Sequence, residues 1–115
     1  MKEGVVELAM LPQTDGSLKR RPVVVLREMR PFRDWLVCGV STQLRQEVVG
    51  FDELLRKSDA DFALSGLRDE SLIRLGFLLV LPQSDLIGRI GEIAPDRHRR
   101  LLQTLADYLR PTATP

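Results

Sequence analysis

Two short apolar runs, each joined to a group of polar side chains, constrain the fold of this chain more than any other feature. They are KRRPVVVL at residues 19–26 and DWLVCGVSTQ at residues 34–43. Because β-branched and aromatic residues favour extended structure, both runs predict strands. The first run brings Arg21 to the start of its strand, and the second ends in two hydroxyls and an amide. If the strands are neighbours, Arg21 and Ser41 converge on one small anion, such as a phosphodiester.

The remainder of the chain predicts further short strands and a single helix. Gly76 inside an apolar run suggests either a β-bulge or a close approach of another backbone segment. Residues 52–67 fit either a short helix or a wrapped loop. The predicted strands are residues 4–10, 21–28, 34–42 (central in the sheet), 47–51, 71–81 and, as an edge strand, 87–93. From Pro95 to about residue 109 the spacing predicts a helix with one apolar stripe, made of Leu101, Leu102, Leu105, Tyr108 and Leu109. This order of elements indicates a mainly β fold with α (α+β), a small barrel with a helix packed on it.

Length and composition set the outer limits. A chain of 115 residues fits one compact domain, which we expect at residues 1–110, with residues 111–115 as a flexible tail. The net charge of +1 does not by itself imply a nucleic-acid or membrane partner. No secretory signal is recognised, and no apolar stretch has the length that spans a bilayer. The single cysteine, Cys38, excludes an intramolecular disulfide, so we expect a cytoplasmic protein.

The distribution of charge is more informative than the net charge. Residues 19–33 hold six basic residues and one acid, whereas residues 47–70 hold seven acids and three basic residues. The two segments either present opposite electrostatic fields or belong to an ordinary mixed surface, and the sequence leaves both interpretations open.

The basic residues around Arg21 are candidate phosphate contacts. Pro22 fixes the backbone next to Arg21, whose guanidinium offers planar donors that match a phosphate. Alternatively, Arg21 is a surface residue that pairs with Asp15. Lys19 and Arg20 either add phosphate contacts or keep a sheet edge soluble.

The polar residues at the end of the second run are the other candidates. Ser41, Thr42 and Gln43 either project into a cleft or bond locally to the backbone where the strand ends. Arg74 interrupts the apolar run at residues 71–81, so its side chain faces either solvent or a site.

The sequence lacks the patterns of several other catalytic classes. His98, between two arginines on the predicted helix, is expected to be exposed, and Cys38 is expected to be a small buried apolar residue. No second histidine or paired cysteine makes a metal-binding pattern, and Asp59 and Asp61 lack the spacing of a calcium loop, so we expect no metal and no cofactor. Catalysis would then use arginine, hydroxyl and backbone groups. Such a set can cleave RNA, because the 2′-hydroxyl supplies the nucleophile.

A series of short motifs follows in order along the chain. They are GVV at residues 4–6, LP at 11–12, TDG at 14–16, KRRPVVVL at 19–26, VCGVSTQ at 37–43, DFALSGL at 61–67, SLIRLG at 71–76 and IGEI at 90–93. Their order and spacing together resemble the MazF/PemK toxins, small ribonucleases of type II toxin–antitoxin systems.

The resemblance implies an SH3-like small β-barrel of the MazF/PemK/CcdB type that forms a homodimer and binds a cognate antitoxin, with residues 19–33 as the docking surface. It also implies metal-independent cleavage of single-stranded RNA at short sequences, which leaves 2′,3′-cyclic phosphate and 5′-hydroxyl ends. An arginine before a proline and a hydroxyl at the end of the third strand act in the MazF branch, and a later arginine acts in the PemK branch. The resemblance therefore implies three catalytic residues, Arg21, Ser41 and Arg74, and four RNA-binding residues, Lys19, Arg20, Thr42 and Gln43.

One departure from the family pattern keeps an alternative open. The PemK branch has an aspartate two residues after its arginine, where this chain has Gly76, so the general base is unassigned. The alternative is a catalytically degenerate module of the same fold that binds RNA or a peptide. Gyrase-poisoning toxins share the fold but end in a Trp-Gly-Ile-like tail, whereas residues 113–115 read Ala-Thr-Pro, so a topoisomerase target is not expected.

Overall fold

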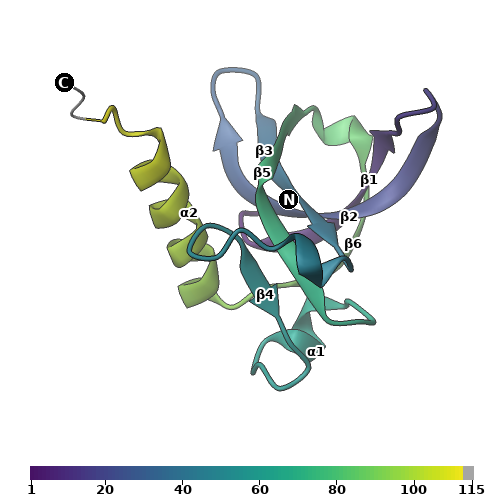
Figure 1. Ribbon diagram of the computed structural model, residues 1–115. Coiled ribbons are helices and arrows are strands. Elements are labelled where there is room, and N and C mark those ends of the chain that lie inside the picture. The colour runs from purple at the N-terminus through teal and green to yellow at the C-terminus, as the bar shows by residue number, and fades with distance from the viewer. Residues whose placement is uncertain (113–115) are drawn as a thin grey trace.

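The computed structural model describes residues 1–112 and contains a six-stranded antiparallel sheet with helices beside it (Figure 1). The strands are β1 (Val5–Pro12), β2 (Leu18–Met29), β3 (Asp34–Ser41), β4 (Glu53–Leu55), β5 (Ser71–Leu81) and β6 (Leu86–Glu92). The helices are α1 (Phe62–Ser65), α2 (Pro95–Leu109) and two 3-10 turns, η1 (Leu44–Gln46) and η2 (Gln83–Asp85). The sequence predicts a flexible tail at residues 111–115, and residues 113–115 of it lie outside the part of the chain that the structure describes. The single domain at residues 1–110 stays a prediction.

Hairpins build most of the sheet, whose strand order is β4-β5-β3-β2-β1-β6. β1, β2 and β3 pair consecutively, β3 then pairs with β5, and β4 adds to the outer side of β5. β6 returns to pair with β1, so segments from the two ends of the described chain lie side by side (Figure 1). β3 lies between β2 and β5, which confirms the prediction that residues 34–42 form a central strand.

The sheet is not closed into a barrel, because its edge strands β4 and β6 do not pair with each other. α1 lies against the edge strand β6. Two glycines permit this approach: a Cβ on Gly66 would collide with the carbonyl of Ile90, and a Cβ on Gly91 would collide with that of Leu64. The predicted α+β class is therefore confirmed, and the sheet of this small barrel-like fold is open, with α1 against β6.

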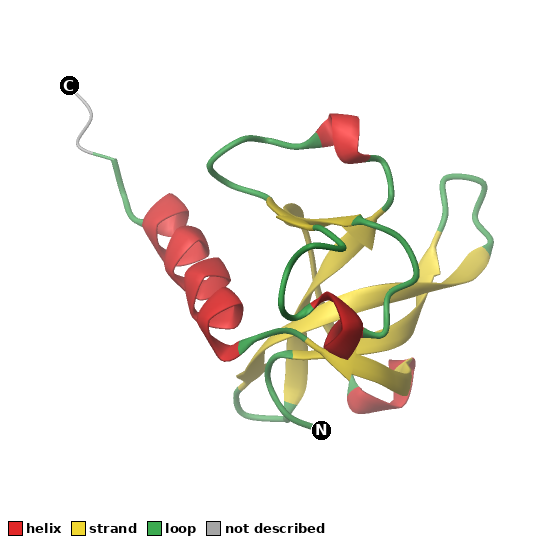
Figure 2. Ribbon diagram, turned by 90° about the horizontal axis from the view of Figure 1, so that it is seen from below, coloured by secondary structure: helices red, strands yellow, loops and turns green. Residues whose placement is uncertain are grey.

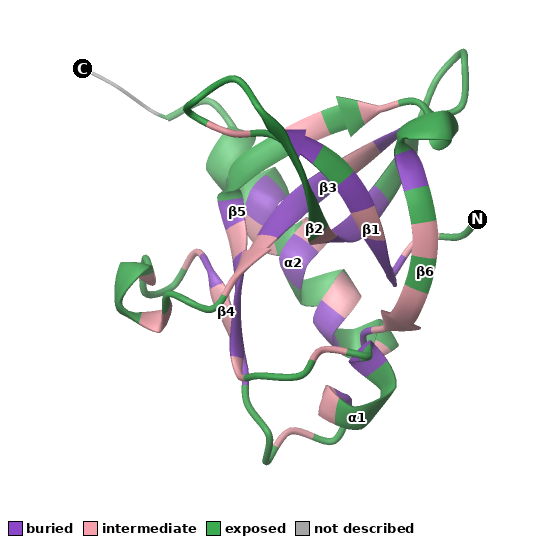
Figure 3. Cartoon of the chain, turned by 90° about the vertical axis from the view of Figure 1, so that its right-hand side faces the viewer, coloured by how far each residue is buried: buried purple, intermediate pink, exposed green. Residues whose placement is uncertain are grey.

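Side-chain alternation divides the apolar residues between the two faces of the sheet. One face carries Val24, Cys38 and Ile73 and packs against Leu101 and Leu105 of α2. Figure 2 shows α2 on one side of the strands, and Figure 3 shows the buried residues of β1, β2 and β3 together with those on the inner side of α2. The opposite face has its own buried cluster, which includes Val23, Val25, Trp35 and Val37.

The predicted strand at residues 47–51 is wrong. These residues form a turn in which Gly50 has a φ of +82°, and β4 begins only at Glu53. The Asp52 carboxylate holds the turn, because it accepts hydrogen bonds from the Val48 N–H at 2.9 Å and the Leu75 N–H at 3.1 Å. Side-chain bonds to the backbone therefore replace a strand ladder here. The stretch left open between helix and loop, residues 52–67, contains both β4 and the single turn of α1.

α2 begins and ends where the spacing predicts, but its apolar stripe is only partly buried. Leu101 and Leu105 are buried and Leu102 is half-buried, whereas Tyr108 and Leu109 are exposed. The last turn extends beyond the strands (Figure 2), so it has no sheet face to cover.

His98 is half-buried, and the expectation that it would be exposed is wrong. Its imidazole lies beside Gly4, and Nε2 is 2.8 Å from the Leu26 carbonyl oxygen. The first turn of α2 packs directly on the β1–β2 end of the sheet, and this contact covers the ring.

Arg97, one residue earlier, is buried among acids that the sequence places far away. Its guanidinium donates to Asp61 Oδ2 at 2.8 Å, Asp59 Oδ2 at 3.1 Å and Glu53 Oε1 at 2.9 Å, and to the Leu54 carbonyl at 3.1 Å. We call these five residues the Arg97 cluster. Three acids of the segment 47–70 are thus paired with Arg97 of α2, so this segment does not present its whole charge as an external field.

The Arg97 cluster also sets the protonation of Asp61. Burial raises the pKa of the Asp61 carboxyl, but the Arg97 hydrogen bond, the Ala94 N–H and the Arg97 charge outweigh burial and lower the pKa from 3.8. Burial likewise lowers the pKa of Arg97, but its hydrogen bond to Asp61 and the charges of the nearby acids raise the pKa above its ordinary value. The pair is therefore charged at neutral pH.

Candidate functional site

The residues predicted as catalytic come from three neighbouring strands and share one face of the sheet. In the β2–β3 ladder Val23 is the partner of Gly39, and continuing that register aligns Arg21 with Ser41. In the β3–β5 ladder Arg74 is the partner of Gly39. Since directly opposed residues project to the same side, Arg21, Ser41 and Arg74 all belong to the face opposite α2.

These side chains line one pocket of about 740 Å³. Its walls come from the end of β1 and the following loop, the start of β2, the end of β3, the loop before β5, and β5 itself. Thr42 and Gln43, which the sequence also predicts, line the same pocket. Lys19 and Arg20 are exposed on β2, where they oppose Leu11 and Met10, and are not part of the pocket lining.

The charge of the pocket suits an anion. Its lining contains three arginines, Arg21, Arg68 and Arg74, and one carboxylate, Asp69. An excess of positive charge inside a concave surface concentrates anionic ligands there. The guanidinium forks provide directional donors for phosphate oxygens.

Ser41 satisfies both interpretations left open by the sequence. Its Oγ accepts a hydrogen bond from the Gln43 N–H at 3.0 Å, which is the local backbone bond expected where a strand ends. Accepting that bond leaves the hydroxyl proton free to donate to another group. The local bond therefore fixes the position of the hydroxyl at the pocket wall without using its donor.

The predicted irregularity at Gly76 is confirmed by the register of β5. Cys38 opposes Leu78, but the next residue of β3, Gly39, opposes Arg74. Residues 75–77 of β5 are thus left without partners on β3. This bulge turns the first half of β5 toward the pocket and brings Arg74 into its lining.

Sequence reasoning missed Arg68 and Asp69, which follow α1. Gly66, with a φ of +74°, ends that helix, and the Ser71 hydroxyl donates to the Asp69 carbonyl at 2.8 Å. These features fix the local shape of the loop that carries Arg68 and Asp69. The signal in the sequence is the glycine in SGLRD, which marks a helix end and hence a loop, but it does not show where the loop lies.

The remaining candidates lie away from the pocket. Cys38 is fully buried on the α2 face, and burial raises the pKa of its thiol to about 12. Within residues 1–112 no group of three or more His, Cys, Asp or Glu side chains has the arrangement of a metal site. Asp59 and Asp61 instead bind Arg97. No helix in that range is both long enough and apolar enough to cross a bilayer.

Comparison with known proteins identifies the family. The family described as "PemK-like, MazF-like toxin of type II toxin-antitoxin system" matches residues 2–109. The Mycobacterium tuberculosis toxin MazF-mt6 has a similar structure, with a TM-score of 0.65 and 20% sequence identity over 90% of this chain and 93% of that one. No curated protein matches this chain.

The chain belongs to the PemK-like, MazF-like toxins of type II toxin–antitoxin systems, because the family match covers nearly its whole length. The likeness to MazF-mt6 supports the fold. Membership implies a cognate antitoxin as a partner.

Proposed function

We propose that this toxin is an endoribonuclease that cleaves single-stranded RNA at the pocket on β2, β3 and β5. The observation that carries the proposal is that Arg21, Ser41 and Arg74 line one cavity, although 53 positions separate the first from the last. Two guanidiniums and a free hydroxyl proton match the oxygens of a phosphodiester. Cleavage is metal-independent, and the protein acts in the cytoplasm.

The proposed reaction uses the substrate's own nucleophile. The 2′-oxygen attacks the adjacent phosphorus, a bond forms between them, and the bond from phosphorus to the 5′-oxygen breaks. Arg21 and Arg74 stabilise the charge of the phosphorane, and Ser41 donates to one of its oxygens. The products carry a 2′,3′-cyclic phosphate and a 5′-hydroxyl, whose proton comes from Arg21 or from water.

Asp69 is the group we assign to accept the 2′-hydroxyl proton. It is the only carboxylate in the pocket lining, and its side chain makes no hydrogen bond or ion pair with any of residues 1–112. Asp69 thus places a carboxylate at the pocket, although residue 76, where the family resemblance implies an aspartate, is a glycine. A carboxylate within reach of the 2′-hydroxyl meets the geometric requirement for a general base.

The partners follow from the same assignment. Thr42 and Gln43 contact the RNA inside the pocket. Lys19 and Arg20 contact backbone phosphates of the RNA strand where it runs out of the pocket along β2. The antitoxin docks on residues 19–33, which carry six basic residues, and blocks entry to the pocket. The protein acts as a homodimer.

The test is incubation of the purified protein with a long single-stranded RNA in the presence of EDTA, with Arg21→Ala and Arg110→Ala in parallel. Arg110 lies at the end of α2, away from the pocket, and provides a matched loss of one arginine. We expect discrete fragments with 5′-hydroxyl ends from the wild type and Arg110→Ala. Arg21→Ala should cleave about 100- to 1000-fold more slowly. Equal rates for Arg21→Ala and the wild type would remove Arg21 from the mechanism.

The second candidate function is binding without cleavage, which Gly76 favours because it stands where an acid is expected. RNA that stays intact with all three folded proteins, but shifts their mobility in a binding assay, would establish this alternative and reject the ribonuclease.

A further inference from the structure

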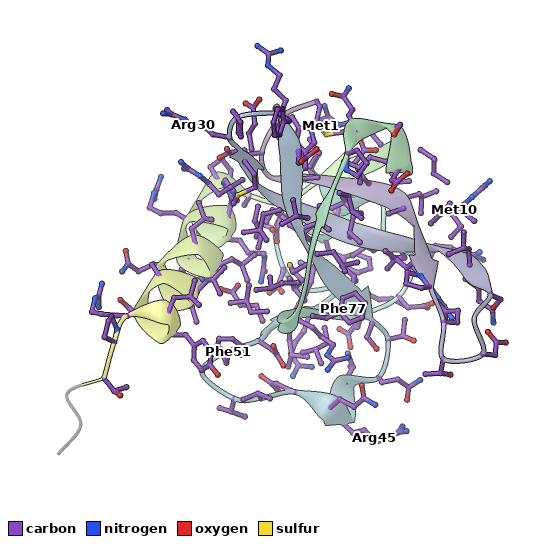
Figure 4. All side chains as sticks on the ribbon, turned by 90° about the horizontal axis from the view of Figure 1, so that it is seen from above. Met1, Met10, Arg30, Arg45, Phe51 and Phe77 are labelled. Carbon is purple, nitrogen blue, oxygen red and sulfur yellow. The ribbon has the colours of Figure 1, made fainter. Side chains whose placement is uncertain are left out.

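The lining of the pocket contains one aromatic side chain, Phe77, which neither the sequence reasoning nor the proposed reaction uses. The ring is 37% exposed although it is large and apolar. Among residues 1–112 it stacks on no other aromatic ring; the described aromatic pair is Phe51 with Tyr108. In the view of Figure 4 Phe77 lies inside the outline of the molecule, whereas Arg30 lies at its edge.

The bulge in β5 places Phe77 over the middle of the site. Residues 75–77 have no partner on β3, so the chain at Phe77 is released from the regular ladder. Gly39, the partner of Arg74, lies beneath the ring: a Cβ on Gly39 would be only 2.9 Å from Phe77 Cδ1. The ring therefore occupies the space that the missing side chain leaves above the backbone of Gly39.

The surroundings of the ring indicate what covers its exposed part. Arg21, Arg68 and Arg74 line the same cavity and suit phosphate groups, while the ring offers an apolar surface beside them. Single-stranded nucleic acids present this combination, because each phosphate is followed by a base with a flat apolar face. Proteins that bind single strands commonly pair a basic groove with an aromatic platform.

We propose that Phe77 forms a base-stacking subsite, in which its ring packs against the base of a nucleotide next to the phosphate held by Arg21 and Arg74. The proposal rests on the proposed function, since it assigns single-stranded RNA as the ligand of the same pocket. Stacking of this kind tolerates any base, so Phe77 contributes affinity and position and does not read sequence.

The test measures binding without cleavage. The probes are four fluorescent 2′-O-methyl RNA homopolymers, one for each base, and a 2′-O-methyl strand of equal length without bases. Methylation blocks the 2′-nucleophile, so affinity is measured separately from the reaction. The proteins are the wild type, Phe77→Leu, Phe77→Trp and Phe32→Leu. Phe32 is 82% exposed on the β2–β3 hairpin and does not line the pocket, so its variant is the matched control.

We expect Phe77→Leu to bind the homopolymers about 5- to 150-fold more weakly than the wild type, the range found for loss of one stacked base. Phe77→Trp and Phe32→Leu should bind like the wild type. The decisive comparison uses the strand without bases, which the wild type and Phe77→Leu should bind equally. Circular dichroism of each variant checks that it is folded.

Other outcomes refute the subsite and separate it from the ribonuclease. Unchanged homopolymer binding by Phe77→Leu, or an equal loss on the strand without bases, would overturn the stacking role. If either occurs while the wild type still cleaves RNA, the proposed function stands alone. If the wild type binds the homopolymers through Phe77 but leaves RNA intact, the subsite stands and the ribonuclease is rejected.

Discussion

Replacing Arg97 by methionine should destabilise the fold severely. Methionine keeps the extended apolar stem of the arginine side chain but has none of the guanidinium N–H donors that bind the Arg97 cluster. The Asp61 carboxylate, whose side chain is 5% exposed, is left without its cation. Breaking a buried ion pair by removing one partner costs about 3–5 kcal/mol. Because the Asp61 carboxylate still accepts the hydrogen bond from the Ala94 N–H at 2.9 Å, we expect a loss of stability at the lower end of that range, about 3 kcal/mol. This loss is a large part of the roughly 5–15 kcal/mol that stabilises a typical domain.

Urea unfolding measures this loss directly. The fluorescence of Trp35, the single tryptophan and 6% exposed, and far-UV circular dichroism should report one transition at a lower urea concentration. Arg110→Ala removes an exposed arginine whose ion pair with Asp107 lies at the surface, so it should cost under about 0.5 kcal/mol. A loss for Arg97→Met as small as that of Arg110→Ala would refute our account of the buried cluster.

The same cluster makes the stability of the protein depend on pH. The folded state lowers the pKa of Asp61 from its ordinary 3.8, so the stabilisation from this group is complete above that value and is lost as the pH falls through the lowered pKa. The wild type should therefore lose stability on acidification below about pH 4. Asp61→Asn, which does not titrate, should show a shallower dependence over that range, and an identical slope for both proteins would remove Asp61 from the explanation.

Two further predictions concern the core and the seam beside α1. Cys38, with its pKa raised to about 12 by burial, should resist a thiol reagent at pH 8 in the native protein and react fully in urea; rapid native labelling would contradict the buried position. Gly91→Ala should cost about 1–3 kcal/mol in urea unfolding, because the new methyl meets the backbone of Leu64 and Ser65, whereas Gly88→Ala on the same strand meets nothing within 4 Å; equal stability of the two variants would disprove the close packing of α1 on β6.

The strands and the core of the site could be predicted from sequence because their signals are local. The run VVVL is nearly continuous in β-branched residues, and the polar residues after VCGV mark where β3 ends, although β2 begins at Leu18, ahead of Arg21. Neighbouring strands then bring Arg21 and Ser41 together by register alone. Glu47–Phe51 looks equally strand-like, but a side chain outside the run, Asp52, decides its conformation by bonding to the backbone.

The features that could not be predicted depend on contacts between distant residues. Arg97 stands in the polar run DRHRR and reads as a surface residue, yet its partner Asp61 is 36 positions away and Glu53 is 44. Phe77 looks like one more core residue of an apolar strand. Gly76 indicates a bulge, but only the actual register shows that it spans three residues and turns Phe77 over Gly39.

The pairing of β1 with β6 has a consequence for how the toxin is made. A ribosome releases β1 before β6, but the partner of Val5 in the sheet is Glu92, so that edge of β1 stays unpaired until residues 86–92 have emerged. Ile90 of β6 also lines the pocket, together with Leu8 of β1. The nascent polypeptide therefore lacks an assembled pocket until β6 has emerged, and the proposed nuclease cannot complete its site while the ribosome is still making residues 86–92.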